Sequence, residues 1–427
     1  MNTPSEAAGA DAPKVKSFVA LRHPGCRAYL LGTMLAMMAD NIEHVISYWI
    51  IFQKFHSPAL GGFAVISHWA PFLFFSVYAG ALADRFDPRR VIQIAMGLFM
   101  LASAGWGMLF LTDSLEQWHA VVLLVIHGLA GVLWSPSAQL IIHDIVGRTH
   151  LQSAIRMMST ARQLGLLMGP AIGGGILLAF GPAWGILFNC LIYLPLTLWL
   201  INAPYGVRSR DGTAPQRRRG ISGYADVVET VKMIAGNRLI VGMILLAGVA
   251  SLIVGNAHQA QMPEFAHDLG HGDRAGLHYT VLLTGGAAGA LAAGIILESR
   301  NLLAANPRTA FMLVMLWAIA IGIFATTSNY VIAVAAIVAA GFLNLAYGSM
   351  IQTLVQLHAP ERIRGRVIGL YNMSAHGLRT FSGVTVGFGG SLIGVHWSLA
   401  LSAMLLLALT VGMVSLTSWA KAGTDTG

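Results

Sequence analysis

Twelve long apolar stretches constrain this chain more than any other feature. We place them near residues 28–52, 60–83, 91–111, 119–142, 152–179, 183–202, 238–262, 277–297, 310–327, 330–356, 366–393 and 397–420. A helix needs about 20 apolar residues to cross a bilayer, and each stretch is near that length. Only 10% of the residues are charged, against about a quarter in soluble domains. Because an unpaired backbone is costly in lipid and the alternation of a β-barrel is missing, we predict an all-α membrane protein.

The basic residues are distributed unevenly among the connections between these stretches. Alternate connections hold Arg85, Arg89, Arg90, Arg148, Arg300, Arg308, Arg362, Arg364 and Arg366, whereas the others hold only Lys54 and Arg274. Cytoplasmic loops of membrane proteins collect Lys and Arg, so both termini are predicted to be cytoplasmic. The polar residues 1–27 contain no apolar run typical of a signal peptide. The net charge of +8 is therefore attributed to topology, and no nucleic-acid partner is expected.

The longest connection, residues 203–237, divides the chain into two groups of six spans. It is basic, with "VRSRDG" and "RRRG", and then reads "YADVVETVKMIAG", which could form an amphipathic helix on the membrane surface. We therefore expect a cytoplasmic tail at 1–27, one six-helix bundle at 28–202, this linker, a second bundle at 238–420 and a short tail at 421–427.

A weak internal repeat supports two related halves. The segment "GRTHLQSAIRMMSTARQLGLLMGPAIGG" from Gly147, moved by 217 residues, falls on "RGRVIGLYNMSAHGLRTFSGVTVGFGG" from Arg364. This alignment places Arg162 on Arg379 in the fifth and eleventh spans. Transporters that rock two halves about a central site commonly carry such symmetry, so the two bundles are predicted to be pseudo-symmetric.

The connection after the second span carries a recognisable motif, "GALADRFDPRR". On this motif and the twelve spans, the chain resembles the major facilitator superfamily, and the resemblance covers nearly its whole length. It implies a cytoplasmic latch that favours the outward-facing state, formed by Gly80, Asp84, Arg85, Arg89 and Arg90. A basic loop that only sets topology explains the arginines but not Gly80 and Asp84. The matching "GALAAGIILESR" in the second half lacks the aspartate, so the latch is expected to be one-sided.

The fifth span carries "GLLMGPAIGG", which is similar to the pattern of antiporter branches of that family. Its gating residues would be Gly165, Gly169, Pro170, Gly173 and Gly174, although ordinary close packing of helices also explains the glycines. This segment and the later segment "PERIRGRVIGLYN" are similar in sequence to the enterobactin-exporter-like branch of drug and siderophore exporters. The chain departs from proton-coupled drug antiporters at Leu124, where those often have a membrane arginine.

Two acids lie well inside the first span, Asp40 and Glu43, with His44 one turn beyond Asp40. The only permanent bases at comparable depth are Arg162 and Arg379, so the formal charges cancel. One interpretation is a permanent salt bridge between an acid and an arginine. In the other, Asp40, Glu43 and His44 couple transport to protons, and the arginines bind a substrate anion when a carboxylate is protonated. Ionisable groups at membrane depth are usually functional, which favours the second.

Other polar and aromatic residues within the spans are candidates for substrate binding. Besides the two arginines they are Asn256, His258, Gln259, Asn344, Tyr347, Gln352, His376, Trp69 and Tyr371. His68, His127, His258 and His376 are scattered along the chain without carboxylates at ligand spacing, so no metal site is predicted. No cofactor is expected either.

These observations predict a secondary active transporter that exports a siderophore- or drug-like molecule by alternating access, with proton antiport. The expected partners are a small-molecule substrate, protons and the lipid bilayer, and the resemblance implies a monomer in a bacterial-type inner membrane. A uniporter or importer of a small metabolite remains an alternative, and a non-transporting receptor or scaffold is another. An enzyme is not predicted, because no nucleophile and base spacing or phosphate-cradling loop is present.

Overall fold

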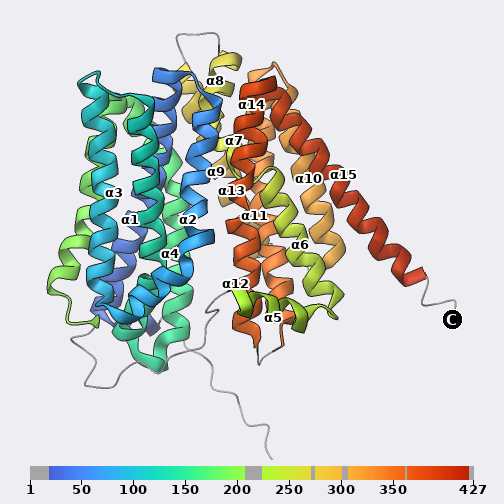
Figure 1. Ribbon diagram of the computed structural model, residues 1–427, viewed down its shortest axis with the longest axis horizontal. Coiled ribbons are helices and arrows are strands. Elements are labelled where there is room, and N and C mark those ends of the chain that lie inside the picture. Colours follow the sequence, from blue (N-terminus) through green and yellow to red (C-terminus); the bar gives the residue numbers. More distant parts are fainter. Residues whose placement is uncertain (1–18, 207–223, 271–274, 301–305, 361–362, 423–427) are drawn as a thin grey trace, which may run out of the picture.

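The computed structural model describes residues 19–206, 224–270, 275–300, 306–360 and 363–422, and these residues form two bundles of helices placed side by side (Figure 1). The first bundle begins with the short η1 (Val19–Arg22) and continues with α1 (Pro24–Phe55), α2 (Pro58–Arg85), α3 (Pro88–Leu111) and α4 (Gln117–Asn202). Proline opens α1, α2 and α3 near the first helical position, where its missing N–H costs nothing.

The long helix α4 is three consecutive membrane passes. Its backbone turns back at Gly147 and at Gly181, where φ is 65° and 73°. Positive φ is readily adopted only by glycine, so these two residues allow sharp reversals without an intervening loop. The reversals fall at the boundaries expected between the fourth, fifth and sixth spans.

The helices of the second bundle are interrupted more often than those of the first. It contains α6 (Arg238–Ile253), α7 (Ala257–Ala260), α8 (Met262–Gly270), α9 (Ala275–Arg300), α10 (Pro307–Thr326), α11 (Tyr330–His358) and α15 (Val395–Ala422). Its eleventh pass consists of α12 (Arg364–Asn372), α13 (Arg379–Ser382) and α14 (Gly389–Ile393), joined by the π-helical turns η4 (Met373–Gly377) and η5 (Gly383–Phe388). Such π turns inside helices often mark functional sites.

In the part of the chain that the structure describes, the helices make twelve membrane passes, as predicted, and the all-α fold of two six-helix bundles is confirmed. Within the described ranges, nine helices are long and apolar enough to cross a membrane, and one of these, Ser153–Asn202, makes two passes. The remaining two are α1, whose acids and His44 lower its hydropathy, and the interrupted eleventh pass. Large apolar side chains such as Leu101, Leu191 and Ile295 are more than half exposed on the sides, as expected for a lipid-facing surface.

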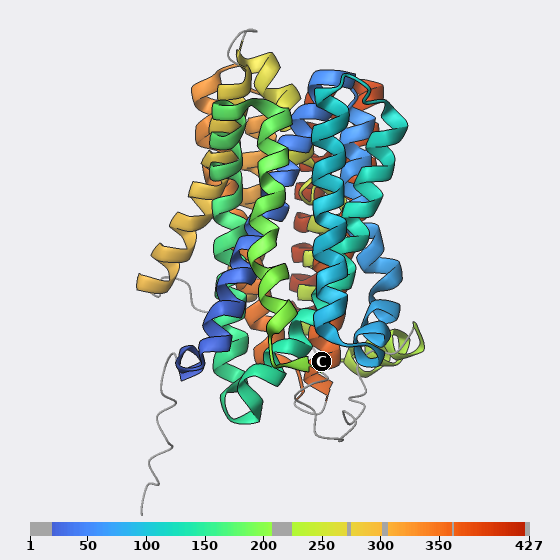
Figure 2. The same cartoon turned by 90° about the vertical axis from the view of Figure 1, so that its left-hand side faces the viewer.

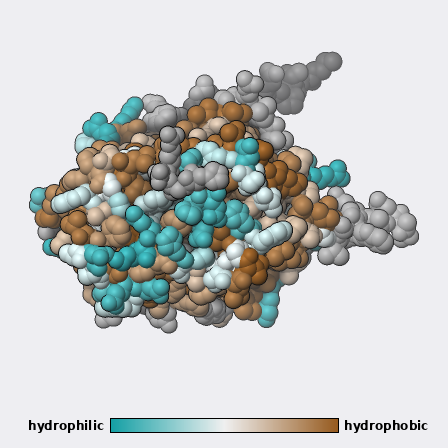
Figure 3. Space-filling view, turned by 90° about the horizontal axis from the view of Figure 1, so that it is seen from above, coloured by the Kyte–Doolittle hydropathy of each residue, from teal (hydrophilic) through white to brown (hydrophobic). Residues whose placement is uncertain are grey.

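The linker contains α5 (Tyr224–Ile234), which lies across the lower end of the molecule instead of running along the bundle (Figures 1 and 2). Glu229 on α5 pairs with Arg366 near the start of α12, with 3.1 Å between Oε2 and Nη1. Viewed from above, hydrophilic residues gather toward the middle of the opposite, upper end (Figure 3).

Several contacts to backbone atoms join the two bundles from the upper end to the middle. The backbone of α2 at Gly62 touches η5 so closely that a Cβ on Gly62 would lie 2.4 Å from the Gly383 oxygen. Gln261 donates from Nε2 to the Pro58 oxygen at 2.8 Å, and Tyr279 donates from its hydroxyl to the Val45 oxygen at 2.6 Å. These contacts close the upper end of the interface between the bundles.

Candidate functional site

Helix α1 buries its acids at mid-length inside the first bundle. Asp40 is 8% exposed and Glu43 is 1% exposed, so neither faces lipid. Residues three and four apart share a helix face, which brings Asp40, Glu43 and His44 to one side of α1. A polar stripe of this kind is stable at membrane depth only if other helices cover it with polar partners.

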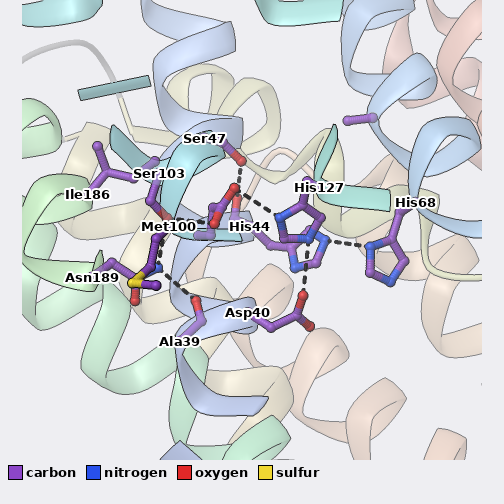
Figure 4. A network of polar contacts seen from close by, with 12 residues as sticks. Ala39, Asp40, His44, Ser47, His68, Met100, Ser103, His127, Ile186 and Asn189 are labelled. Atoms are coloured by element: carbon purple, nitrogen blue, oxygen red, sulfur yellow. Dashed lines mark hydrogen bonds and ion pairs between the residues drawn. The ribbon is translucent and has the colours of Figure 1, made fainter. Parts of the chain in front are cut away.

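The partner of both acids is His127, on the first pass of α4, and not an arginine. Its Nδ1 lies 2.9 Å from Glu43 Oε1 and its Nε2 lies 3.0 Å from Asp40 Oδ1 (Figure 4). The imidazole is 4% exposed, so it sits between the two carboxylates away from solvent. A single histidine therefore joins the two acids that the sequence places beside each other.

Glu43 is held by a second group of buried polar residues. Ser103 on α3 donates to Glu43 Oε2 at 2.6 Å. Asn189, on the last pass of α4, donates from Nδ2 to the Ala39 oxygen at 2.9 Å and to Ser103 Oγ at 3.3 Å (Figure 4). Every contact in this chain of hydrogen bonds lies within the first bundle, so it fixes the Glu43 carboxylate independently of the second bundle.

His44 faces His68 on α2. Their Nε2 and Nδ1 atoms are 3.2 Å apart, and the His44 ring also lies edge-on to His127 with centroids 4.7 Å apart. Three imidazoles and the Asp40 carboxylate therefore meet at one place, although they come from three different helices (Figure 4). These histidines are far apart in the sequence, and the fold brings them together.

The expected pairing of the acids with Arg162 or Arg379 is not found: in the described part of the chain, neither arginine forms an ion pair with Asp40 or Glu43. The physical reason is that His127 already occupies the carboxylates. Of the two arginines, Arg162 is the one in electrostatic range of Asp40, and its guanidinium lies 5.6 Å from the Trp134 ring centroid.

Arg379 occupies the face between the bundles. Its guanidinium lies 5.0 Å from the centroid of the Trp69 ring, which belongs to the other bundle. Its Nε is buried without a hydrogen-bond partner, as is Nδ1 of His258. Arg379 as a whole is only partly buried, but a buried N–H of a charged group that lacks an acceptor is costly, and an arrangement of this kind suits an anion that arrives from outside.

Several predicted binding residues gather near Arg379. Tyr347 and Tyr371 are the phenols in electrostatic range of its charge. The remaining contacts are from Asn344 to the Tyr347 hydroxyl at 3.2 Å, from Trp69 Nε1 to Asn256 Oδ1 at 3.2 Å, and between the Trp69 and His376 rings at 5.9 Å. His376 is nevertheless exposed, which indicates open space beside it between the bundles.

Two predicted binding residues are not part of this group. Gln259 and Gln352 are both exposed, and within the ranges that the structure describes they make no hydrogen bond to the residues around Arg379. Their assignment to the substrate site therefore stays a prediction without structural support.

The glycine pattern of the fifth pass forms a packing surface. Gly165, Gly169 and Gly173 lie against α1, where a Cβ on Gly169 would be 2.4 Å from Asn41 Cβ. Gly174 faces Thr280 of α9 in the other bundle, and the helix continues through Pro170. The pattern therefore holds the helix that carries the acids on one side and contacts the second bundle on the other.

The predicted latch is described only in part. Gly80, Asp84 and Arg85 belong to α2, but their side chains lie outside the part that the structure describes. Arg89 is 5% exposed, pairs with Asp87 at 2.6 Å and donates to the Ala203 oxygen at 2.7 Å, whereas Arg90 is exposed. The contacts of Arg89 stay within the first bundle, and a latch between the bundles remains a prediction.

His127, His68, Ser103 and Asn189 were not predicted as site residues. Each stands inside an otherwise apolar span, which was the available signal. His127 also lies about one turn from Leu124, so the fourth pass does supply a basic group near the position where the drug antiporters often have arginine. The sequence alone could not show that these four side chains face the acids of α1.

Comparison with known proteins adds the family context. The Major Facilitator Superfamily profile matches residues 29–384. The enterobactin exporters EntS of Shigella boydii serotype 4 and of Salmonella typhi are 23% and 24% identical over 351 and 352 residues, covering 82% of this chain and 81% of each relative.

Solved transporters share the fold at low sequence identity. An inward-facing, unoccupied bacterial homolog of the human lysosomal transporter Spinster has a TM-score of 0.69 at 15% identity, covering 94% of this chain and 98% of its own. The nucleoside transporter NupG has a TM-score of 0.66 at 13% identity, with 91% and 99% covered.

Proposed function

Because this chain belongs to the Major Facilitator Superfamily, we propose that it is a secondary active transporter that exports a small organic or amphipathic molecule by alternating access. Its similarity to enterobactin exporters supports export and a siderophore- or drug-like substrate. Transport, and not catalysis, is what the family and these relatives have in common. We place the protein in a bacterial-type inner membrane as a monomer with both termini in the cytoplasm, in line with the basic connections.

The observation that carries the substrate proposal is the isolated charge of Arg379. Its guanidinium lies over the Trp69 ring where the two bundles meet, and its Nε has no hydrogen-bond partner. An anionic group of the substrate would supply the missing partner through charge-assisted hydrogen bonds. Tyr347, Tyr371 and His376 would line the same space, and the tyrosines add donors for an oxygen-rich ligand.

The proposed driving reaction is proton antiport at Asp40, Glu43 and His44. Antiport requires that proton and substrate compete. A hydrogen-bond donor of the substrate can bind the Asp40 carboxylate only when that carboxylate carries no proton. Arg379 stays charged whether Asp40 is protonated or not. His127 bridges the two acids. The other charged or titratable groups that interact with Asp40 are His44, His68, Tyr48, Tyr193 and Arg162, so an added proton enters a set of coupled groups. The exchange of arginine partners expected from sequence is replaced by competition at Asp40.

The closed upper end fits one state of the cycle. We propose that this is the inward-facing state, in which Gly62, Gln261 and Tyr279 seal the periplasmic side. The glycines of the fifth pass would guide the movement of one bundle against the other, and the loop from Gly80 to Arg90 would latch the opposite state.

The decisive experiment is transport by the purified protein in sealed proteoliposomes. A thermal-shift screen of siderophores, cationic drugs and organic acids first selects a ligand, and its flux is then measured with and without a pH gradient. Arg379→Gln is expected to weaken binding of an anionic ligand roughly 10- to 100-fold, since a charged hydrogen bond is worth about 1.5–3 kcal/mol. The exposed Arg308→Gln serves as the matched control and should bind normally.

Two acid variants separate coupling from binding. Asp40→Asn and Glu43→Gln should block gradient-driven flux and leave folding nearly intact, while the surface variant Asp113→Asn should transport normally. Unchanged pH dependence in both acid variants would remove the coupling assignment. Flux that ignores a pH gradient in the unaltered protein would identify the uniporter alternative, and absence of any substrate movement would favour the receptor or scaffold.

A further inference from the structure

Four potential metal ligands converge inside the first bundle, apart from the space beside Arg379. Asp40 and His44 come from α1, His68 from α2 and His127 from α4. One nitrogen or carboxylate oxygen from each residue lies within 4.8 Å of the corresponding atom of the other three (Figure 4). The arrangement joins residues as far apart in sequence as positions 40 and 127.

Two edges of a coordination tetrahedron are already present. With metal–ligand bonds of about 2.0–2.1 Å, neighbouring ligand atoms of a tetrahedral site are about 3.3 Å apart. His44 Nε2 and His68 Nδ1 are 3.2 Å apart, and His127 Nε2 and Asp40 Oδ1 are 3.0 Å apart. The longest separations must shrink by up to about 1.5 Å, which small side-chain rotations provide.

One ring nitrogen of His127 is bound to a carboxylate, as is usual for histidines that bind a metal through the other nitrogen. Its Nδ1 donates to the Glu43 carboxylate at 2.9 Å, and Glu43 is held in turn by Ser103. A histidine ligand almost always gives its other ring N–H to a carboxylate or carbonyl, which fixes the tautomer and turns the free lone pair to the metal. His127 Nε2 is fully buried, and although it is close to Asp40 it makes no aligned hydrogen bond. This nitrogen lies 3.0 Å from Asp40 Oδ1, and both residues belong to the cluster.

We propose that Asp40, His44, His68 and His127 bind one divalent first-row transition-metal ion. Three imidazoles and one carboxylate suit ions such as Zn²⁺, Ni²⁺, Co²⁺ or Fe²⁺, whereas Mg²⁺ and Ca²⁺ prefer oxygen ligands. Asp40 and Glu43 together carry two negative charges, which offset the charge of the ion in this buried place.

Two of the four ligand residues are partly accessible. His44 and His68 are only partly buried, and the His68 ring contacts Trp69 at 4.7 Å between centroids. Trp69 in turn faces His376 and Arg379 of the second bundle. These contacts place the cluster next to the interface between the bundles. Metal binding here goes beyond the proposed export and requires neither export nor proton coupling.

The test uses the full-length protein, purified in detergent and stripped of metal. Titration with Zn²⁺ and with Ni²⁺ against a competing chromogenic chelator should show one ion per chain, with no competition from Mg²⁺. X-ray absorption at the nickel edge should show three imidazoles and one oxygen donor, and it needs no variant. A spectrum without imidazole scattering, or binding without saturation near one ion per chain, overturns the proposal.

Variants locate the site. His68→Ala and Asp40→Asn should weaken Zn²⁺ binding at least tenfold, and Glu43→Gln about 10- to 100-fold through the orientation of His127. The matched control is His396→Ala, which removes a histidine that lies 3.1 Å from Asp268 at the upper surface. Loss of binding in His396→Ala, with His68→Ala unaffected, would assign the ion to the surface and refute the proposal. If a cluster variant does not fold, the absorption spectrum of the unaltered protein decides.

Discussion

Gly62 is the position where one added methyl group should change the conformation of the whole protein. A Cβ there would lie 2.4 Å from the Gly383 oxygen and 2.7 Å from Gly387 Cα. Ordinary contacts of a Cβ begin near 3.4 Å, so α2 and η5 would have to separate by about 1 Å. Both contacts are backbone atoms, and no side-chain rotation can relieve them.

Gly62→Ala should destabilise mainly the state in which the upper end is closed. Overpacking of this kind costs about 1–3 kcal/mol. Because every 1.4 kcal/mol is a factor of ten, the ratio of closed to open molecules should fall roughly 5- to 150-fold. Alanine is also a better helix former than glycine, so α2 itself is not weakened. The variant should therefore remain folded and favour the state that is open at the upper end.

Spin labels on Ser114 and Ser328, exposed residues of the two bundles, measure this opening by pulsed electron paramagnetic resonance in nanodiscs. The distance distribution should lengthen in Gly62→Ala. Gly97→Ala is the control, since a Cβ on Gly97 meets nothing within 4 Å. An unchanged distribution in folded Gly62→Ala would refute the argument that this contact holds the bundles together.

Three further substitutions test other contacts. Tyr279→Phe removes the hydrogen bond between its hydroxyl and the α1 backbone, worth about 1 kcal/mol, so the same labels should show a shift of roughly fivefold toward the open state. Gly128→Ala would place a Cβ 1.9 Å from the Ser67 oxygen inside the first bundle, so it should lower the melting temperature without a specific change in the label distance. Arg366→Gln breaks only an exposed ion pair with Glu229, worth less than about 1 kcal/mol, and should leave the melting temperature unchanged.

The membrane passes were predictable because their signal is local. Apolar length defines a span, and Gly147 and Gly181 lie where polar or glycine residues separated neighbouring stretches. The broken passes were not predictable in the same way. The seventh stretch reads as one apolar run, yet its helix ends at Ile253 and the backbone at Gly255 has φ of 49°. A hydropathy average over about 20 residues is insensitive to a turn of a few residues, even where it includes a polar side chain such as Asn256.

In the cluster around the acids, only the residues on α1 were predicted. The spacing of Asp40, Glu43 and His44 defines a face of α1, because the helical period is a property of the sequence itself. Which helix covers that face depends on packing between distant segments, and His127 is 84 residues from Glu43. The formal balance of two acids and two arginines suggested the wrong partners, since charge counting ignores a histidine that reaches both carboxylates.

The two halves of the site belong to different bundles. The acids and their histidines are joined by contacts within the first bundle, whereas Arg379 belongs to the second and meets the first through Trp69. Rocking of the bundles would preserve the first set of contacts and break the second. His68 and Trp69 are neighbours on α2, one facing His44 and the other facing Arg379. Because His68 and Trp69 are adjacent, we predict that an ion or proton that repositions His68 shifts the contact between Trp69 and Arg379, with α2 as the connection between the cluster and the interface.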